Sequence, residues 1–223
     1  MAEAYETLTY AADRSMTFWD TADLYGMSEV TIGKWFAETG RRSEIFLATN
    51  HDEVVMEILC PYIEKGTVRY VGLSECSVER LRRARSVPGI GEKVIACQME
   101  YSPFELEIET IGFVAAAREL GASVVAYSPL GRGSSSVLTS SFKSRADFDA
   151  DDFRNYAPRF SDENFPKNLA LVDKFRTVAQ KYDSTPGKIT LMWILATHSD
   201  FVPIPGTRTV ERLEENARQQ RLS

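Results

Sequence analysis

Six short runs of consecutive apolar residues alternate along the chain with segments of helical pattern, and this alternation restricts the fold more than any other feature. The runs are apolar throughout rather than at every second residue, as in strands buried on both faces of a parallel sheet. Most of them begin about 25–30 residues apart, the spacing of strand–helix units in parallel α/β folds. We expect strands at Met16–Asp20, Glu44–Thr49, Val68–Leu73, Val94–Gln98, Ser123–Tyr127 and Phe201–Ile204.

The helical segments between these runs have recognisable ends. We expect Ser28 and Ser77 to cap two helices, and Ser184–Pro186 to supply a cap and a first-turn proline for a third. Glu107–Leu120 has apolar residues at helical spacing, Ile111 among them, and predicts one helix.

A closed barrel and a doubly wound sheet both fit this order of elements. A dinucleotide-binding doubly wound sheet needs a Gly-x-Gly-x-x-Gly turn after a strand, and the chain has none. The absence favours the barrel. We expect one domain over residues 1–223.

Composition excludes several classes of protein. The chain has 26 Lys+Arg against 32 Asp+Glu, a net charge of −6, which argues against a general nucleic-acid binder. Its richest apolar stretch, Ile189–Leu195, is too short to span a bilayer, and the N-terminus has no secretory pattern. The three cysteines form no C-x-x-C pair, so we expect no metal site and a reducing, cytoplasmic location.

The one long polar stretch runs from Gly131 to Phe165 and is rich in Ser, Asp and Arg. Long connections inside a compact domain are usually functional or disordered. Two interpretations stay open: a solvated excursion, or a lid over a site.

Polar and aromatic residues follow the strands. In a parallel barrel the active site lies at the carboxyl ends of the strands, so these residues are candidates for it. Taken singly they are weak signals, since an Asp at a strand end is more often a helix cap than a catalyst. The candidates are Asp20–Gly26, Asn50–His51, Ser74–Glu75, Gln98, Tyr127–Gly133 and Pro205–Arg208.

In combination these segments carry a family resemblance. The strings FWDTADLYG, EIFLAT, VRYVGLSE, QMEYSPF, VVAYSPLGRG and PIPGTR occur in this order. The chain resembles the aldo-keto reductases, most of all the fungal and plant branch with pyridoxal-reductase-like and auxin-induced-protein-like members. The resemblance implies a (β/α)8 TIM-type barrel, NADPH as cofactor, and reduction of a small carbonyl substrate, an aldehyde or ketone.

The resemblance also implies roles for individual residues. A tyrosine hydroxyl can give a proton to a developing alkoxide when nearby charge lowers its pKa. Tyr25 would be this proton donor, with Asp20 in the pair of charges that tunes it. The cofactor contacts would be Ser74 and Gln98 on the nicotinamide carboxamide, Tyr127 on its ring, Ser128, Pro129, Leu130, Gly131 and Arg132 along the pyrophosphate, Thr207 and Arg208 at the 2′-phosphate, and Arg212, Glu215 and Asn216 around the adenosine. Arg208 favours NADPH over NADH, because a guanidinium binds phosphate oxygens bidentately.

The chain departs from the family pattern at several places. Asn50 stands where the family has its catalytic lysine, and the following strand–helix unit, which carries the catalytic histidine, is missing. The first barrel strand and the C-terminal substrate loop are missing too. We therefore expect an incomplete barrel of about six strands with two mismatched seams, either strained or open. His51 is either a substitute for the missing histidine or a surface residue.

Three functions stay open. The first is an NADPH-dependent oxidoreductase with impaired turnover, as part of fungal secondary metabolism. The second is an NADPH-binding regulator without catalysis. The third is an inactive, truncated relative, or an incomplete gene product.

Overall fold

The computed structural model describes residues 2–22, 25–50, 56–131, 144–149, 152 and 155–217. All six predicted strands are present near their expected bounds, and every strand pairing between them is parallel. They are β1 (Phe18–Ala22), β2 (Phe46–Asn50), β3 (Val71–Ser74), β4 (Val94–Glu100), β5 (Ser123–Tyr127) and β6 (Val202–Ile204).

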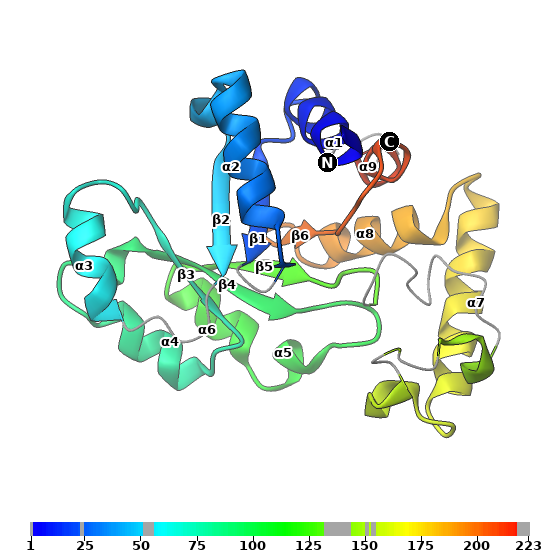
Figure 1. Ribbon diagram of the computed structural model, residues 1–223. Coiled ribbons are helices and arrows are strands. Elements are labelled where there is room, and N and C mark those ends of the chain that lie inside the picture. Colours follow the sequence, from blue (N-terminus) through cyan, green and yellow to red (C-terminus); the bar gives the residue numbers. More distant parts are fainter. Residues whose placement is uncertain are drawn as a thin grey trace.

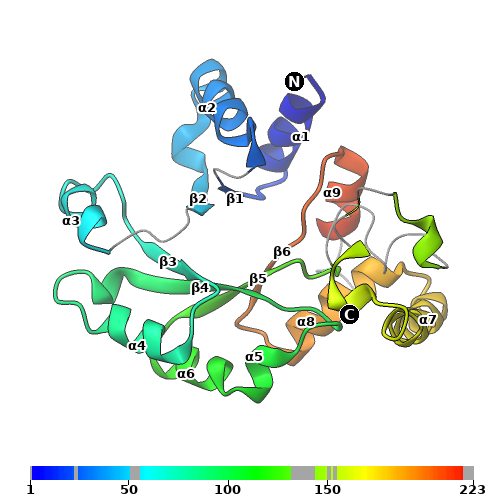
Figure 2. The same ribbon diagram turned by 60° about the horizontal axis from the view of Figure 1, so that its bottom comes forward.

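The strands form two sheets rather than a closed barrel. One sheet has the order β1-β2 and the other β3-β4-β5-β6. Among the described residues, strand pairing stops between β2 and β3 and between β6 and β1, the two places where the resemblance predicts a missing strand. The prediction of an incomplete barrel is confirmed. Figure 2 shows the helices on the outside of both sheets.

Nine α-helices are described. They are α1 (Ala2–Asp13), α2 (Ser28–Thr39), α3 (Met56–Glu64), α4 (Val78–Arg85), α5 (Glu107–Thr110), α6 (Phe113–Glu119), α7 (Phe165–Lys181), α8 (Pro186–Thr197) and α9 (Val210–Ala217). Ser77 and Thr185 cap α4 and α8 as predicted, each accepting a hydrogen bond from the backbone N–H three residues on. No helix in the described part of the chain is long and apolar enough to cross a membrane.

Two predictions about helix ends are wrong. Ser28 is the first residue of α2 rather than its cap, and its hydroxyl accepts a hydrogen bond of 2.8 Å from Thr21 of β1. The helix predicted over Glu107–Leu120 is broken into α5 and α6, because Gly112 has φ = 76°, in the left-handed region. Ile111, expected on the apolar face, lies at the break and is 54% exposed.

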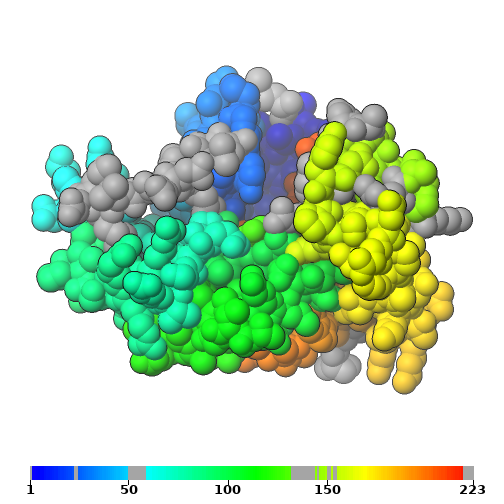
Figure 3. All heavy atoms as spheres, turned by 90° about the horizontal axis from the view of Figure 1, so that it is seen from below, coloured from blue at the N-terminus to red at the C-terminus, as the bar shows by residue number. Residues whose placement is uncertain are grey.

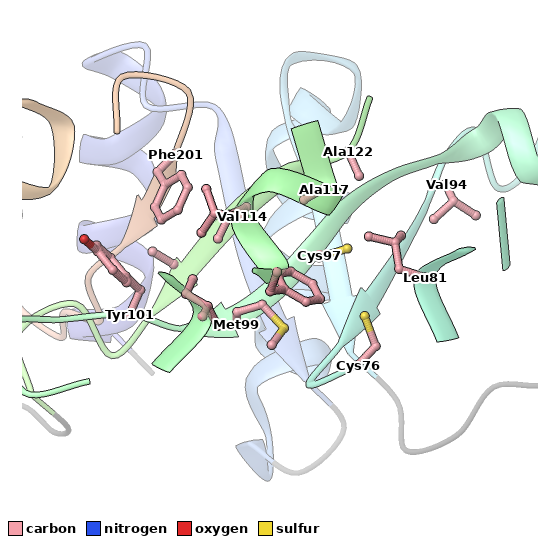
Figure 4. Packing of buried hydrophobic residues seen from close by; sticks show 14 of the residues in the cluster. Cys76, Leu81, Val94, Cys97, Met99, Tyr101, Val114, Ala117, Ala122 and Phe201 are labelled. Atoms are coloured by element: carbon pink, nitrogen blue, oxygen red, sulfur yellow. The ribbon is translucent and has the colours of Figure 1, made fainter. Parts of the chain in front are cut away.

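Each sheet has its own apolar core. Trp19 of β1 packs between the strands and α2, with its ring 5.0 Å from that of the fully buried Trp35. The larger core lies between the four-stranded sheet and its helices, with Leu81 and Cys97 fully buried (Figure 4). A hydrogen bond to Cys76, together with burial, raises the pKa of the Cys97 thiol.

In the described part of the chain, side chains and helices connect the two sheets where strand pairing is absent. Helices α1 and α9 lie side by side (Figure 1), and Glu214 accepts hydrogen bonds from Tyr10 at 2.7 Å and Arg14 at 2.6 Å. The ring of Phe46 in β2 stacks 6.1 Å from that of Tyr70, just before β3. Across the space between the sheets, the Gln98 amide donates a hydrogen bond of 2.8 Å to the Asp20 carboxylate.

The Gln98–Asp20 hydrogen bond should contribute measurably to stability. We expect Gln98→Leu to lower the free energy of unfolding by about 1.5–3 kcal/mol, the usual range for a hydrogen bond to a charged group. Urea unfolding followed by circular dichroism measures this change. Gln180→Leu on the exposed face of α7 is the control, and equal unfolding midpoints for both variants would contradict the prediction.

A polar cluster holds α5 and α8 beside the end of β4. Glu109 accepts a hydrogen bond of 2.5 Å from the buried Tyr101 hydroxyl and lies 2.9 Å from His198 Nε2. Arg118 donates to His198 Nδ1 at 3.1 Å, so Nε2 carries the ring proton that points to Glu109. The bonds from Tyr101 and then His198 hold the pKa of Glu109 below its ordinary value.

This lowered pKa predicts a pH-dependent contribution to stability. A carboxyl whose pKa is lower in the folded than in the unfolded chain stabilises the fold above its unfolded pKa of about 4.3, and this gain is lost as the pH falls through the folded value. Glu109→Gln should therefore reduce the melting temperature at pH 6, and the difference from wild type should shrink below about pH 4.3. Calorimetry from pH 6 to pH 3 tests it, with Glu107→Gln on the same helix as control. A difference that stays constant with pH would contradict the assignment.

Candidate functional site

The inward face of the strands is defined by alternation. Trp19 packs outward against α2, so its neighbour Asp20 points into the space between the sheets. Cys97 belongs to the outer core, so Gln98 points inward as well. The hydrogen bond between Asp20 and Gln98 agrees with this assignment.

Four of the predicted site residues lie on the inward face of the strands, each within two residues of the carboxyl end of its strand. Ser74 lies opposite Gln98 in the pairing of β3 with β4, and both face inward. Tyr127 is the last residue of β5 and is half-buried. Ser74 and Tyr127 end β3 and β5, and Asp20 and Gln98 lie two residues before the ends of β1 and β4. Since parallel strands end at the same edge, all four lie near that edge.

Gln98 is a predicted cofactor contact, and its side chain also bonds to the predicted catalytic residue Asp20. Its amide nitrogen donates to Asp20 at 2.8 Å. A glutamine amide has two N–H donors and a carbonyl acceptor, so this bond leaves one donor and the acceptor for a ligand. The side chain can therefore join the carboxylate of the two-stranded sheet to a ligand on the four-stranded sheet.

Tyr25 lies beyond the end of β1, in a turn before α2. Its side chain is 62% exposed, and among the described residues no hydrogen bond joins its hydroxyl to Asp20. Gly26, next in the chain, has φ = 59° and reverses the chain towards α2. Tyr25 is thus accessible at the carboxyl end of β1, as a group that must reach a substrate has to be.

A tight turn follows Tyr127. Ser128 has φ = 50°, an uncommon value for a residue with a side chain, and the Gly131 N–H donates to the Ser128 carbonyl at 2.9 Å. Gly131 has φ = 82°, and a Cβ at this position would lie 2.8 Å from the Phe104 ring. Pro129 is buried and Leu130 packs on the core, whereas Arg132 lies outside the described residues.

The residues predicted at the adenosine end of the cofactor lie on α9 and in the segment between β6 and α9. Arg208 and Arg212 are exposed near the start of α9, and the Thr207 hydroxyl donates to the Thr209 carbonyl at 3.1 Å. Glu215 accepts a hydrogen bond of 2.6 Å from the hydroxyl of Thr185, which also caps α8, so its carboxylate holds two helices together. Asn216, on the last turn of α9, is half-buried.

A buried acidic group that was not among the predicted site residues lies at the same edge. Glu100 ends β4 beside Tyr127, is 8% exposed, and forms an ion pair with Arg159 at 2.6 Å. Alternation could have found it, because Glu100 follows the inward-facing Gln98 by two residues. Asn50 ends β2 opposite Ala22 in the strand pairing, while His51 lies outside the described residues.

Comparison with protein families gives a match in two pieces. The model of the Aldo/keto reductase family matches residues 1–56 and 49–222. The two pieces meet where the sequence predicts a missing strand–helix unit and where the structure leaves β2 and β3 unpaired.

Individual relatives agree with this match. The chain is 39% identical to "Aldo-keto reductase str7" of Strobilurus tenacellus over 259 residues, covering 96% of this chain and 75% of the relative. It is 42% identical to "Aldo-keto reductase yakc [NADP(+)]" of Schizosaccharomyces pombe over 262 residues, covering 94% and 75%. Both alignments are longer than the chain of 223 residues, so they contain positions that the chain lacks.

The fold is also found among solved structures. The glycerol dehydrogenase AKR11B4 from Gluconobacter oxydans superposes with a TM-score of 0.79 at 23% identity, covering 95% of this chain and 78% of that one. The structure of an aldo/keto reductase from Brucella melitensis gives a TM-score of 0.67 at 19% identity over the whole chain and 84% of its own. The family model and the relatives establish that the chain belongs to the aldo/keto reductase family of oxidoreductases.

Proposed function

We propose that the chain binds NADPH along the carboxyl edge of the four-stranded sheet and reduces an aldehyde or ketone to an alcohol. The observation that carries the proposal is the continuity of this sheet. Ser74, Gln98 and Tyr127 come from its neighbouring strands β3, β4 and β5, and β6 continues towards Arg208. One of the relatives bears NADP(+) in its name, which supports the choice of cofactor.

The chemistry of the side chains fits such a dinucleotide. Ser74 and Gln98 offer a hydroxyl and an amide, the groups that recognise a carboxamide, while the half-buried Tyr127 ring offers a surface for stacking. Arg208 and Arg212 add two exposed guanidinium groups near a helix N-terminus, which suit a phosphate monoester. When bound, NADPH would supply the hydride for the reduction.

The protein's own part in the reaction is to deliver a proton. We propose that the Tyr25 hydroxyl gives its proton to the carbonyl oxygen as that oxygen gains negative charge. Asp20 is the carboxylate of the pair of charges that we propose tunes this hydroxyl, and Gln98 fixes its orientation through the hydrogen bond at 2.8 Å. The small carbonyl substrate, a place in fungal secondary metabolism and a cytoplasmic location belong to this proposal.

A second candidate is an NADPH-binding protein with little or no turnover. Asn50 favours it, because β2 ends there with a residue that cannot supply the cation expected beside Asp20. Without that cation the proton-donating tyrosine loses the charge that would stabilise its phenolate, and a loss equivalent to a few pKa units would slow proton transfer about a thousandfold. Residual rather than fast reduction is therefore the expected activity.

Cofactor binding should appear as thermal stabilisation. We expect NADPH at a hundred times its Kd to stabilise the folded chain by about 2.7 kcal/mol and to raise its melting temperature. NADH, which lacks the 2′-phosphate, should raise it less at the same concentration. Calorimetry measures both. Arg208→Met should reduce the NADPH shift towards that of NADH, and the absence of any shift with wild-type protein would overturn the proposal.

Carbonyl reduction should depend on the Tyr25 hydroxyl. We expect Tyr25→Phe to lower kcat about a hundredfold or more, the usual contribution of a positioned general acid. The assay follows NADPH absorbance with a panel of small aldehydes and ketones. Tyr182→Phe is the matched control, since Tyr182 is similarly exposed at 56% but lies at the end of α7. Equal rates for Tyr25→Phe and wild type would rule out Tyr25 as the donor.

Asn50→Lys separates the two candidates. If the chain is a reductase that lacks only its cation, this variant should raise kcat at least about tenfold, and Tyr25→Phe should remove the gain. If the chain only binds NADPH, Asn50→Lys should leave turnover at background while the thermal shift persists.

A further inference from the structure

Arg159, in the long polar stretch, connects this stretch to the end of β4. Arg159 forms ion pairs with Glu100 at 2.6 Å and with Glu105 at 2.5 Å, one through each terminal nitrogen of its guanidinium. The side chains of Arg159 and Glu100 are 18% and 9% exposed, so this contact is mostly shielded from solvent. Asn168 of α7 donates to the Arg159 carbonyl at 2.8 Å and holds its backbone.

The first carboxylate, Glu100, stands beside Tyr127. The two residues are opposite each other in the pairing of β4 with β5. The next residue, Tyr101, donates its N–H to the Tyr127 carbonyl at 3.3 Å, and the Glu100 N–H donates to the Glu75 carboxylate at 3.0 Å. Arg159 thus fixes the Glu100 side chain on β4, next to the strand β5 from which the turn 127–131 starts.

The second carboxylate, Glu105, closes a turn that touches the other end of 127–131. Ser102 and Glu105 exchange backbone hydrogen bonds of 3.1 Å and 2.9 Å, with Phe104 between them. The Phe104 ring lies so close to Gly131 that a Cβ there would be 2.8 Å from it. The ion pair that holds Glu105 therefore also restrains the Phe104 ring, which packs against Gly131.

Apolar packing supports the same arrangement. Phe148, Phe160 and Phe165 form a small core with Val172, and the Phe104 ring packs against it. The Phe148 ring meets those of Phe160 and Phe165 edge-on at 5.9 Å and 5.4 Å. The space-filling view shows the yellow-green and yellow atoms of this region against the green atoms that follow β4 (Figure 3). Phe148, Phe160 and Phe165 thus anchor the described part of the polar stretch by apolar packing.

We propose that Arg159 is a positioning residue for the turn 127–131, which it holds in its binding shape through Glu100 beside Tyr127 and through Glu105 and Phe104 beneath Gly131. The inference rests on the proposed function, in which this turn follows the pyrophosphate of NADPH. Arg159 itself bonds to the two carboxylates and acts on the ligand only through the turn.

A positioning role predicts weaker cofactor binding with unchanged chemistry. Loss of the ion pairs should let Phe104 and the turn move, so that bound NADPH has to order them again, whereas the proton donor on β1 is untouched. This would raise Kd and KM for NADPH and leave kcat at saturation nearly constant.

The test compares Arg159→Met, Glu105→Gln and a matched control. Glu105→Gln keeps the ion pair to the buried Glu100, so it remains informative if Arg159→Met fails to fold. The control is Arg82→Met, which removes an exposed two-nitrogen ion pair with Glu119 at 3.1 Å and 2.7 Å. NADPH binding is measured by fluorescence titration, and kcat at saturating NADPH by absorbance.

We expect Kd for NADPH to rise about tenfold in Arg159→Met and about threefold in Glu105→Gln, with kcat within about twofold of wild type. Arg82→Met should bind NADPH like wild type. If the folded variants melt earlier but keep the wild-type Kd, Arg159 is only a structural residue and the proposal is overturned.

Amide exchange separates this proposal from the proposed function. The Gly131 N–H is hydrogen-bonded to Ser128, so its exchange in NMR reports the turn without any ligand. It should exchange at least about tenfold faster in Arg159→Met and Glu105→Gln than in wild type. If wild type binds no NADPH yet this acceleration is seen, the proposed function fails while the positioning of the turn stands. Unchanged exchange would overturn the positioning role itself.

Discussion

Backbone hydrogen bonding between parallel strands determines this architecture, and among the strands that the structure describes it is interrupted between β2 and β3 and between β6 and β1. Six strands in two sheets cannot share an uninterrupted ladder, so the seams depend on other contacts. One seam is bridged by α1 and α9, the other by the stacked rings of Phe46 and Tyr70. The incomplete pairing leaves apolar side chains of the inner face open to solvent. Phe18 and Phe46 point inward and are still 38% and 40% exposed.

The sequence predicts what local pattern determines. All six strands and the caps at Ser77 and Thr185 follow from apolar runs and side-chain chemistry within a few residues. The break at Gly112 was missed, because an apolar pattern at helical spacing continues across a glycine that can adopt positive φ. The grouping of Asp20, Ser74, Gln98 and Tyr127 near the carboxyl ends of their strands was predictable from the rule that parallel strands end together.

The local sequence pattern does not predict contacts between segments that are far apart in the chain. Nothing in the residues around Arg159 indicates that its partners lie at the end of β4. The Gln98–Asp20 bond likewise joins residues 78 positions apart, on different sheets. In the proposed reaction the two sheets have different tasks, since the cofactor groups lie on the larger one and the proton donor follows β1. The proposed reaction then depends more on how the two sheets are placed relative to each other than on any one side chain.

The separate cores also affect how unfolding is observed. The chain has three tryptophans, and two of them, Trp19 and Trp35, lie in the core of the two-stranded sheet, while Trp193 packs against the core of the larger one. Tryptophan emission therefore reports mainly the smaller part of the molecule, whereas far-ultraviolet circular dichroism averages over all its helices. The two signals follow one transition only when both sheets unfold together.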